Sequence, residues 1–220
     1  MTLDPAPLLN RLAVLLGWEG SADLEFDWPA LEEAAGHPFP KDYRRYVERF
    51  PPGDIGFLKV LHPLRWGATE DFLTYARNWH DVMNEKAELA GGVRYHFGSS
   101  PGDLRVWGTV NLDYLLCWRL DGGPPEQWPT VVCDTAMADP PERYAGTVTE
   151  LLVDLAEARN PLPVIGYVTE IEGAPHDEGQ CRKLHLAGLS GQYSLPCSQD
   201  HPLTPTPPDI GRPAEQGSDT

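Results

Sequence analysis

The C-terminal part of the sequence carries residue types that bind metal ions. Cys181 lies four residues before His185, and Cys197 lies four residues before His201. Two thiolates and two imidazoles form a ligand set that zinc accepts in tetrahedral protein sites. The residues between the two pairs are rich in glycine and match no usual zinc-finger spacing. Because the ligand types suit zinc but the spacing does not, a zinc-dependent module is only an alternative hypothesis. The leading hypothesis involves no metal and no cofactor.

Two aspartates offer a second arrangement that could do chemistry. Asp113 and Asp134 lie near the ends of predicted strands, where paired carboxylates could act as general acid and base. Roles in turns and caps explain both residues equally well. No HExxH, GxSxG or P-loop spacing is present in the sequence. The histidines are scattered along the chain: His37, His62, His80, His96, His176, His185 and His201. We therefore expect a protein without catalytic residues.

Five stretches have the periodicity or the end signals of helices. Asp4 and Asp27 are expected to cap the first two helices, and Gly36 is expected to end the second. Thr147 and Glu150 have the spacing of a capping box, which predicts the start of the last helix. The predicted helices span residues 5–16, 28–35, 40–50, 69–90 and 147–158.

The helix predicted from Pro40 to Phe50 has aromatic residues on one face and carries no residues suited to catalysis. Tyr43, Tyr46 and Val47 recur with Phe50 at the i, i+3, i+4, i+7 spacing of a buried helix face. We expect Tyr43, Tyr46 and Phe50 to be fixed in the core, so that this helix is part of the scaffold. The side chains expected to face water are Arg44, Arg45 and Glu48.

Runs of β-branched and aromatic residues predict a sheet. One strand is expected before the long helix, at residues 55–63, and four more follow it, at residues 93–97, 104–110, 114–120 and 130–134. Their short connections favour antiparallel pairing. Trp107 and Trp118 lie inside strands and are expected to be packing residues of the core. The predicted fold is α+β, with a central and mostly antiparallel sheet flanked by helices.

The composition divides the chain into three parts. Residues 1–23 are predicted to form an N-terminal helix, and residues 24–160 the α+β domain. Residues 161–220 are rich in proline and glycine and are expected to be a largely disordered tail, because they cannot bury enough apolar surface to offset their conformational entropy. A body of about 150 residues buries roughly 70 % of its unfolded surface, so the domain needs no disulfide for its core.

The chain is strongly acidic. It has 17 Lys and Arg against 33 Asp and Glu, a net charge of −16, and residues 1–160 alone have 14 against 25, a net charge of −11. Phosphate backbones are repelled by such a surface, so we expect a basic protein partner and no nucleic acid.

Other sequence features indicate the compartment. No apolar run approaches the roughly 18 residues of a membrane span, and the first residues lack the cationic region of a signal peptide. We therefore expect a cytoplasmic protein with no membrane partner, favoured as a monomer. The cysteines are sparse for this length and are expected to be reduced thiols: Cys117, Cys133, Cys181 and Cys197.

The order of these elements resembles the SUKH superfamily, which includes fungal cell-wall-assembly regulators and many bacterial immunity proteins. The resemblance covers residues from about Leu24 to Ala158. It rests first on WPALEEAAGHPFPKDYRRYVERFPPGDIGFLKVLHP, which is similar to the family's sequence of a Trp, a short helix, an aromatic helix and a Gly-bearing turn into a strand. WGTVNLDYLLCWRL is similar to the family's next strand pair. Two features depart from the family pattern: Leu112 replaces a usual glycine, and Pro51-Pro52-Gly53 replaces a Tyr-Gly-x-Gly type turn.

The resemblance implies a function as well as a fold. It implies no conserved catalytic machinery, and a role in binding and neutralising a cognate toxin, often a nuclease or deaminase, inside the cell that makes it. The leading hypothesis is therefore an immunity protein that binds a basic toxin directly. One alternative is a regulatory scaffold or adaptor of the same fold that uses the proline-rich tail, and the other is the zinc module described above.

Loops are where we expect a partner to bind. Trp128 lies in the loop DGGPPEQWPT and Trp66 in the loop HPLRWGATE, and each is interpreted either as part of a partner surface or as a lid over the core. The candidate partner-binding residues are Asp121, Glu126, Trp128, Asp134 and Trp66.

Overall fold

The computed structural model describes residues 4–18, 23–50, 52, 54–55, 58–63, 72–89, 95–137, 140–157, 159 and 162–165. They form an α+β domain with a central antiparallel sheet flanked by helices, which confirms the predicted fold class. The predicted tail lies almost wholly outside the described residues. No helix in the described ranges has the length and apolar character needed to cross a membrane.

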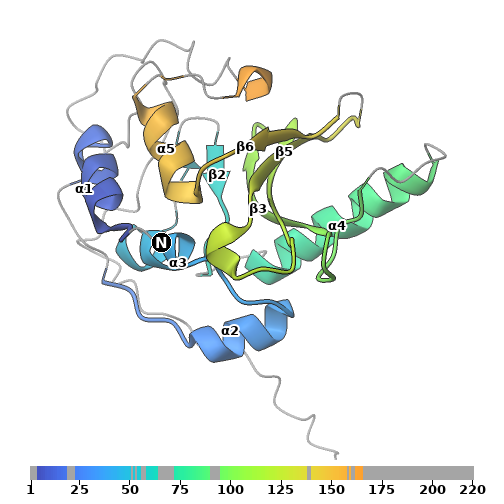
Figure 1. Ribbon diagram of the computed structural model, residues 1–220, viewed down its shortest axis with the longest axis horizontal. Helices are drawn as coiled ribbons and strands as arrows, with labels where there is room; N and C mark the ends of the chain where they lie inside the picture. The colour runs from blue at the N-terminus through green and yellow to red at the C-terminus, as the bar shows by residue number, and fades with distance from the viewer. Residues whose placement is uncertain are drawn as a thin grey trace, which may run out of the picture.

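The elements follow one another in a simple order. The helices are α1 (Ala6–Leu15), α2 (Trp28–Ala35), α3 (Lys41–Arg49), α4 (Phe72–Leu89) and α5 (Val148–Ala156), with short 3-10 helices η1 (Pro125–Gln127) and η2 (Pro163–Ile165). The strands are β1 (Asp54–Ile55), β2 (Leu58–Val60), β3 (Leu104–Val110), β4 (Tyr114–Arg119), β5 (Thr130–Asp134) and β6 (Glu142–Tyr144). They pair in the order β1 to β6, each antiparallel to its neighbour. In Figure 1, α1, α3 and α5 lie together on one side of the sheet, and α4 extends away from it on the other.

The predicted helix signals are confirmed at both ends of α2 and at the start of α5. The Asp27 carboxylate accepts the N–H of Ala30, and Gly36 ends α2 with a φ of +75°. The Thr147 hydroxyl accepts the N–H of Glu150, while the Glu150 carboxylate accepts the N–H of Thr147. Because each of these contacts satisfies a backbone group that the helix leaves unpaired, local sequence alone was sufficient to locate these ends.

Helix α3 is the aromatic scaffold that the sequence predicted. Tyr43, Tyr46 and Phe50 are buried, and the Tyr43 hydroxyl donates to the carbonyl of Leu61 at 2.5 Å. The prediction for Glu48 was wrong, because its carboxylate is largely buried and accepts hydrogen bonds from two neighbouring side chains, as described below.

Aromatic rings join α3 to the middle of the sheet. The ring of Trp118 in β4 meets the ring of Tyr43 edge-on, with centroids 5.0 Å apart. The rings of Phe39, His37 and Trp107 lie about it, at centroid distances of 6.1, 6.2 and 6.2 Å. Trp107 and Trp118 are 0 % and 1 % exposed, which confirms that both are core residues.

The prediction of one strand over residues 55–63 was wrong. The chain forms two short strands that pair with each other, with Asp54 opposite Lys59 and Ile55 opposite Leu58. Ile55, Leu58 and Val60 are all buried, so the apolar run itself belongs to the core. A short apolar run does not show by its composition where the chain reverses direction, which is why one strand was expected.

The prediction of a strand over residues 93–97 was also wrong for the residues that are described, 95–97. Phe97 makes only an isolated bridge to Leu104. The Asn84 side chain of α4 instead donates to the carbonyl of Phe97 at 2.8 Å and accepts its N–H at 2.9 Å. A side-chain amide therefore satisfies the backbone groups that a neighbouring strand would otherwise bind.

Two features extend the domain beyond the predicted elements. Strand β6 pairs with β5 and was not predicted, and its sequence Glu-Arg-Tyr has no apolar alternation to indicate a strand. Leu162 and Ile165 are buried in the core, so the folded region continues past residue 160.

The turn between β3 and β4 contains a leucine in a backbone conformation that suits glycine. Asn111 and Leu112 have φ values of +49° and +64°, and the N–H of Asp113 donates to the carbonyl of Val110. Positive φ at both central positions is the pattern of a type I′ turn, for which Asn-Gly is the favoured pair. Leu112 is one of the two features in which the sequence departs from the pattern that it resembles.

We expect Leu112→Gly to raise the free energy of unfolding by about 0.5 to 1 kcal/mol, because left-handed strain exceeds the entropic cost of glycine at an exposed site. Urea unfolding of the two proteins measures this difference. Leu112→Ala is the matched control, since it removes the same exposed side chain but keeps the strain. An equal gain in both variants would show that the side chain, not the backbone, is responsible.

Stability should fall in acid through His62. Its Nε2–H donates to the carbonyls of Val47 and Phe50 at the end of α3, at 3.0 and 3.1 Å. Burial lowers the pKa of His62 to about 4, against about 6.5 in the unfolded chain. Above pH 6.5 the His62 side chain is neutral in both the folded and the unfolded chain, so its titration does not lower the free energy of unfolding there. Between pH 6.5 and pH 4 only the unfolded chain gains a proton, and this group alone lowers the free energy of unfolding by about 3 kcal/mol in total.

The acid effect is measured by urea unfolding between pH 7 and pH 4. His62→Gln should lose some stability at pH 7 but show a smaller decrease towards pH 4, because its amide donates to the carbonyls without titrating. Parallel pH curves for the two proteins would contradict a titration at His62.

Candidate functional site

Three of the predicted partner-binding residues lie in the loop between β4 and β5. Asp121 is exposed and forms an ion pair with Arg119 at 2.6 Å. Glu126 lies in η1 and is also exposed. Trp128 follows η1 and is only partly exposed, since its ring packs against the core. The loop therefore brings together Asp121, Glu126 and Trp128, as the sequence suggested.

Two contacts hold Trp128 against the rest of the domain. Its indole N–H donates to the carbonyl of Gly123 at 3.0 Å, which closes the loop on itself. Its ring lies 6.0 Å from the ring of His37, at the end of α2. These contacts favour the interpretation of Trp128 as a lid over the core, with its exposed edge as the part that a partner could contact.

The remaining predicted residues are not in this loop. Asp134 lies at the far end of β5, paired with Tyr114, so about 13 Å of strand separates it from the loop. Asp134 is therefore not part of the same surface as Trp128, because β5 carries it to the other end of the strand. Trp66 lies outside the described residues.

Asp113 and Asp134 both have roles in turns. The Asp134 carboxylate accepts the N–H of Ala136 at 2.8 Å, and the Asp113 carboxylate accepts from the Asn111 amide at 3.1 Å. Each carboxylate is thus bound to a near neighbour in the sequence. Both residues thus have the turn and cap roles that the sequence favoured as strongly as acid–base roles.

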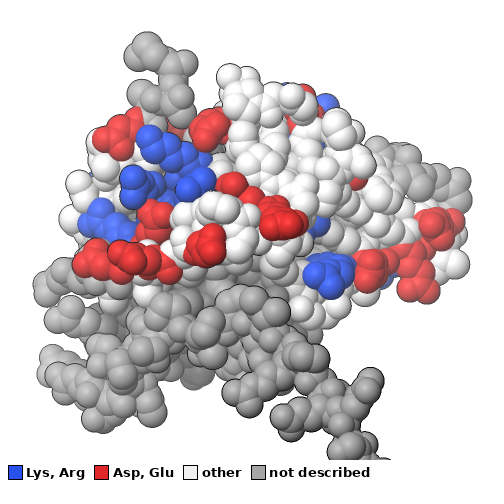
Figure 2. Space-filling view, turned by 90° about the horizontal axis from the view of Figure 1, so that it is seen from below, with Lys and Arg blue, Asp and Glu red and all other residues white. Residues whose placement is uncertain are grey.

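The outer half of α4 presents a continuous exposed stripe that combines acidic and apolar residues. Asp81, Glu85 and Glu88 recur at i, i+4 and i+7, and all three are exposed. Val82 and Leu89 lie beside them on the same side of the helix and are 43 % and 81 % exposed. We call these five residues the α4 face. In Figure 2, acidic side chains gather over the outer part of α4, whereas basic and acidic side chains are mixed at the other end of the molecule.

The carboxylates of the α4 face are not paired within the described part of the chain. Lys86, the basic residue of the last turn, donates to the carbonyl of Thr135 and is thereby directed away from them. By contrast, the arginines of α1 and α3 are engaged: Arg11 with Glu157, Arg44 with Glu32, and Arg45 with Glu48. The acidic charge of the α4 face is thus available to another molecule.

This arrangement does not help the helix to fold. Carboxylates near the C-terminus of a helix oppose its dipole, at a cost of about 0.3 to 1 kcal/mol each when exposed. Like charges at i, i+4, such as Asp81 and Glu85, cost about 0.2 to 0.5 kcal/mol more. The exposed Val82 and Leu89 gain nothing from burial. The exposed acidic and apolar residues of the α4 face therefore contribute nothing to the stability of the helix.

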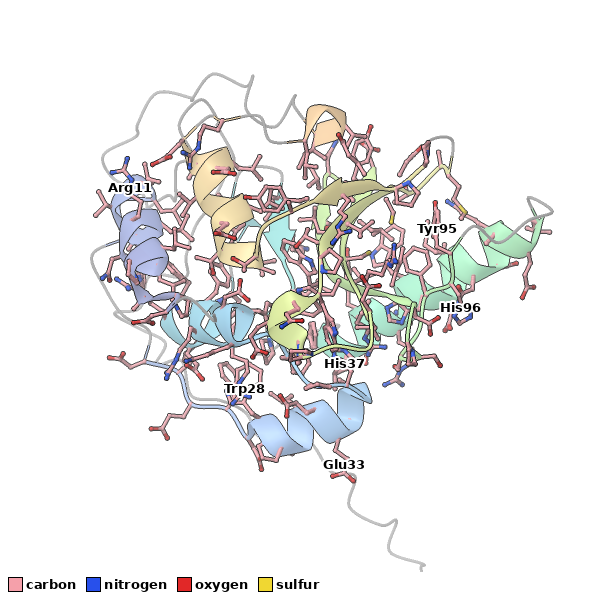
Figure 3. All side chains as sticks on the ribbon, in the orientation of Figure 1. Arg11, Trp28, Glu33, His37, Tyr95 and His96 are labelled. Carbon is pink, nitrogen blue, oxygen red and sulfur yellow. The ribbon has the colours of Figure 1, made fainter. Side chains whose placement is uncertain are left out.

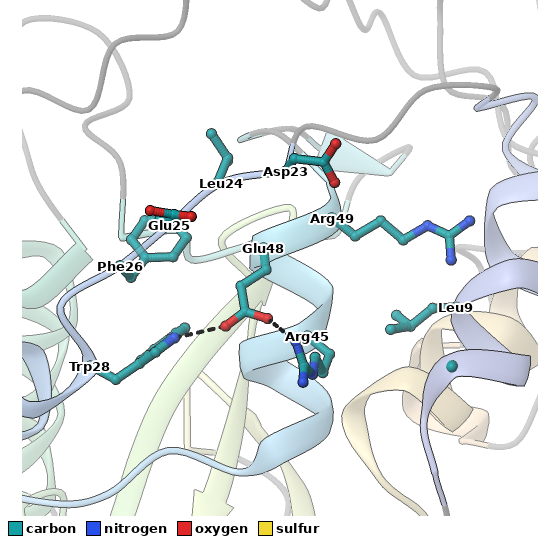
Figure 4. A pocket seen from close by; sticks show the side chains of 10 residues that line it. Leu9, Asp23, Leu24, Glu25, Phe26, Trp28, Arg45, Glu48 and Arg49 are labelled. Carbon is teal, nitrogen blue, oxygen red and sulfur yellow. Dashed lines mark hydrogen bonds and ion pairs between the residues drawn. The ribbon is translucent and has the colours of Figure 1, made fainter.

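A hollow of about 650 Å³ lies between α1, α3 and residues 23–28 (Figure 4). At its centre the Glu48 carboxylate accepts from the Trp28 indole at 2.9 Å and from the Arg45 guanidinium at 3.0 Å. Arg49, on its rim, donates to the Asn10 amide. Because these polar groups are bound to one another, the hollow is a structural junction and offers no free acid, base or nucleophile from them.

Cysteine and metal chemistry receive little support from the described residues. Cys117 and Cys133 are free thiols buried in β4 and β5, and burial raises the pKa of the Cys117 thiol well above its usual range. Within the described ranges, no group of three or more His, Cys, Asp or Glu side chains could hold a metal ion. The predicted zinc ligands Cys181, His185, Cys197 and His201 lie outside those ranges.

For α4, only a helical span, residues 69–90, was predicted from the sequence. The stripe at residues 81, 85 and 88 was visible as a helical repeat of acids, and reading the polar side of the helix would have found it. The exposure of Val82 and Leu89 needed the structure. No family model matches the chain, and neither a curated protein nor a solved structure matches it.

Proposed function

We propose that this chain is a non-catalytic immunity protein that neutralises a basic toxin by binding it directly through the α4 face. The α4 face carries the proposal, because carboxylates that have no partner among the described residues lie beside exposed apolar side chains on one projecting helix. The apolar residues supply buried area in a complex, and the carboxylates select a partner of positive charge.

The overall charge supports a basic partner. The net charge of −16 raises the local concentration of cationic molecules and speeds their association at low salt. A nuclease domain, which binds nucleic acid, has a positive surface of the required sign. The resemblance of residues 24–158 to the SUKH pattern supports the same kind of partner.

The experiment is a calorimetric titration of the full chain with the C-terminal domain of the protein encoded beside its gene. Nanomolar binding, about −12 kcal/mol, is expected, with affinity that falls as the salt concentration rises. Absence of binding at low salt would contradict the proposal.

The adaptor alternative makes a different prediction for the same titration. An adaptor that uses the proline-rich tail would lose binding when residues 161–220 are removed, whereas binding through the α4 face should survive. Because Leu162 and Ile165 are buried, the truncation should begin after Ile165.

A further inference from the structure

Arg105 is a buried guanidinium with no carboxylate partner among the described residues. The residue lies in β3 and is 7 % exposed. Its Nη1 donates to the Ser99 hydroxyl at 3.3 Å, and its Nε is buried without a hydrogen-bond partner in the described part of the chain. Arginine is almost never buried to this extent unless it is paired, because an uncompensated charge is costly in the interior. Among the described residues, no negative charge compensates that of Arg105.

His80 cannot accept from both of the donors that face it. Its Nε2 lies 3.4 Å from the backbone N of Val106, and its Nδ1 lies 3.3 Å from Nη1 of Arg105. Both neighbours are donors only, and a neutral imidazole has one acceptor nitrogen. One of the two contacts is thus a donor facing a donor, and an acceptor atom placed between Arg105 and His80 would relieve it.

His37 adds a second unsatisfied group. Its Nδ1 lies 2.7 Å from the carbonyl of Pro38, so Nδ1–H donates there and Nε2 is left as an acceptor. That Nε2 is buried and has no partner among the residues that the structure describes, and His37 is 6 % exposed. His37 follows α2, and Figure 3 shows it near the end of that helix, with His96 beside α4.

The charges around this cluster are mainly positive. Burial lowers the pKa of His80 to about 3, and Arg105, His37, His96 and Arg77 lower it further in that order. Burial and then Arg105 keep the pKa of His37 at about 4, in spite of its bond to Pro38. Burial lowers the pKa of Arg105 to about 10, with Arg77 adding to the effect. The carboxylate of the neighbouring segment, Asp103, is already bound to His96 and to the N–H of Ser100.

We propose that Arg105 and His80 donate to an oxyanion, either inorganic phosphate or a carboxylate, bound between the guanidinium and the imidazole, and that Nε2 of His37 accepts from the hydroxyl when the anion is phosphate. The planar fork of Arg105 matches two oxygens of such a group, and His80 can donate Nδ1–H to it while Nε2 accepts from Val106. Ser99 and His96 are exposed beside the cluster and mark the side from which the anion enters. This site is separate from the α4 face and does not depend on the proposed toxin partner.

The first test follows the imidazole NMR signals of the full chain during pH titrations in chloride, phosphate or acetate at constant ionic strength. A bound anion should raise the pKa of His37 and His80 by about one unit, because it stabilises their charged forms. His62 is the internal control, since it is buried with a similar pKa but contacts the end of α3 instead. The anion that acts at the lower concentration, phosphate or acetate, identifies the class of ligand.

The second test compares Arg105→Met with Arg119→Met, which removes the same charge from an exposed residue. At about ten times its dissociation constant, the anion should raise the melting temperature of the wild type and of R119M by about 4 °C, and that of R105M not at all. In chloride, R105M should be at least as stable as the wild type, because it removes an uncompensated buried charge. Equal melting temperatures of the wild type in all three salts, with unchanged histidine pKa values, would overturn the proposal whatever the stability of the variants.

Discussion

Trp118→Ala should lower the free energy of unfolding by about 3 to 5 kcal/mol, a large share of the stability of a domain of this size. Trp118 is 1 % exposed and its ring contacts Tyr43 of α3 edge-on. It also touches Phe39 and His37, so one side chain joins the sheet to α3 and to the segment after α2. The substitution leaves a cavity that the rigid strands β3 to β5 cannot close.

Urea unfolding followed by circular dichroism measures this loss as a shift of the midpoint at constant m value. Trp128→Ala is the matched control, because Trp128 is only partly buried and ends in a loop. We expect it to cost less than half as much. A loss below about 1 kcal/mol for Trp118→Ala would mean that the contact between α3 and the sheet is not a principal source of stability.

Reversing two carboxylates of the α4 face, in Glu85→Lys with Glu88→Lys, should slow association with the basic partner about ten- to a hundredfold at low salt. Both residues are exposed and unpaired within the described ranges, so the change removes attraction and introduces repulsion. The same variant should fold as well as the wild type or slightly better, because lysine suits the C-terminal turns of a helix. Stopped-flow association at two salt concentrations measures the first effect, and urea unfolding the second.

The matched control reverses Glu25 and Glu33, which are exposed, lie before and within α2, and are not part of the α4 face. It changes the net charge equally, so it reports the contribution of overall charge alone. Equal slowing in both double variants would mean that the partner responds to net charge and not to the α4 face. Glu126→Lys in the β4–β5 loop tests the alternative contact surface in the same assay.

Local signals in the sequence were sufficient for α2 and α5. The prediction that Asp4 caps the first helix was wrong, because Pro5 is the N-cap residue of α1 and the Asp4 carboxylate only accepts the N–H of Ala6. Asp27 and Gly36 bound α2, and the Thr147–Glu150 box opens α5, because each of these residues acts on backbone groups within a few positions. The strands were less predictable. The reversal after Ile55 and the capture of Phe97 by Asn84 are tertiary effects, and neither leaves a pattern in the run of residues concerned.

The α4 face and the cluster around Arg105 also differ in how far the sequence predicts them. The acidic residues of the α4 face lie on one helix, so the sequence shows their helical spacing. It does not show that their side chains are exposed. Arg105, His80 and His37 come from three separate parts of the chain, and each alone looks like an ordinary scattered residue. Only the packing of α4 and the end of α2 around β3 brings them together.

The most direct test of the proposed function is growth of cells that produce the toxic C-terminal domain of the neighbouring protein together with this chain. We predict that the wild type and the Glu25–Glu33 double variant restore growth, whereas the Glu85–Glu88 double variant does not. Failure of the wild type to protect, in cells that contain folded protein, would contradict the claim that this chain neutralises that toxin.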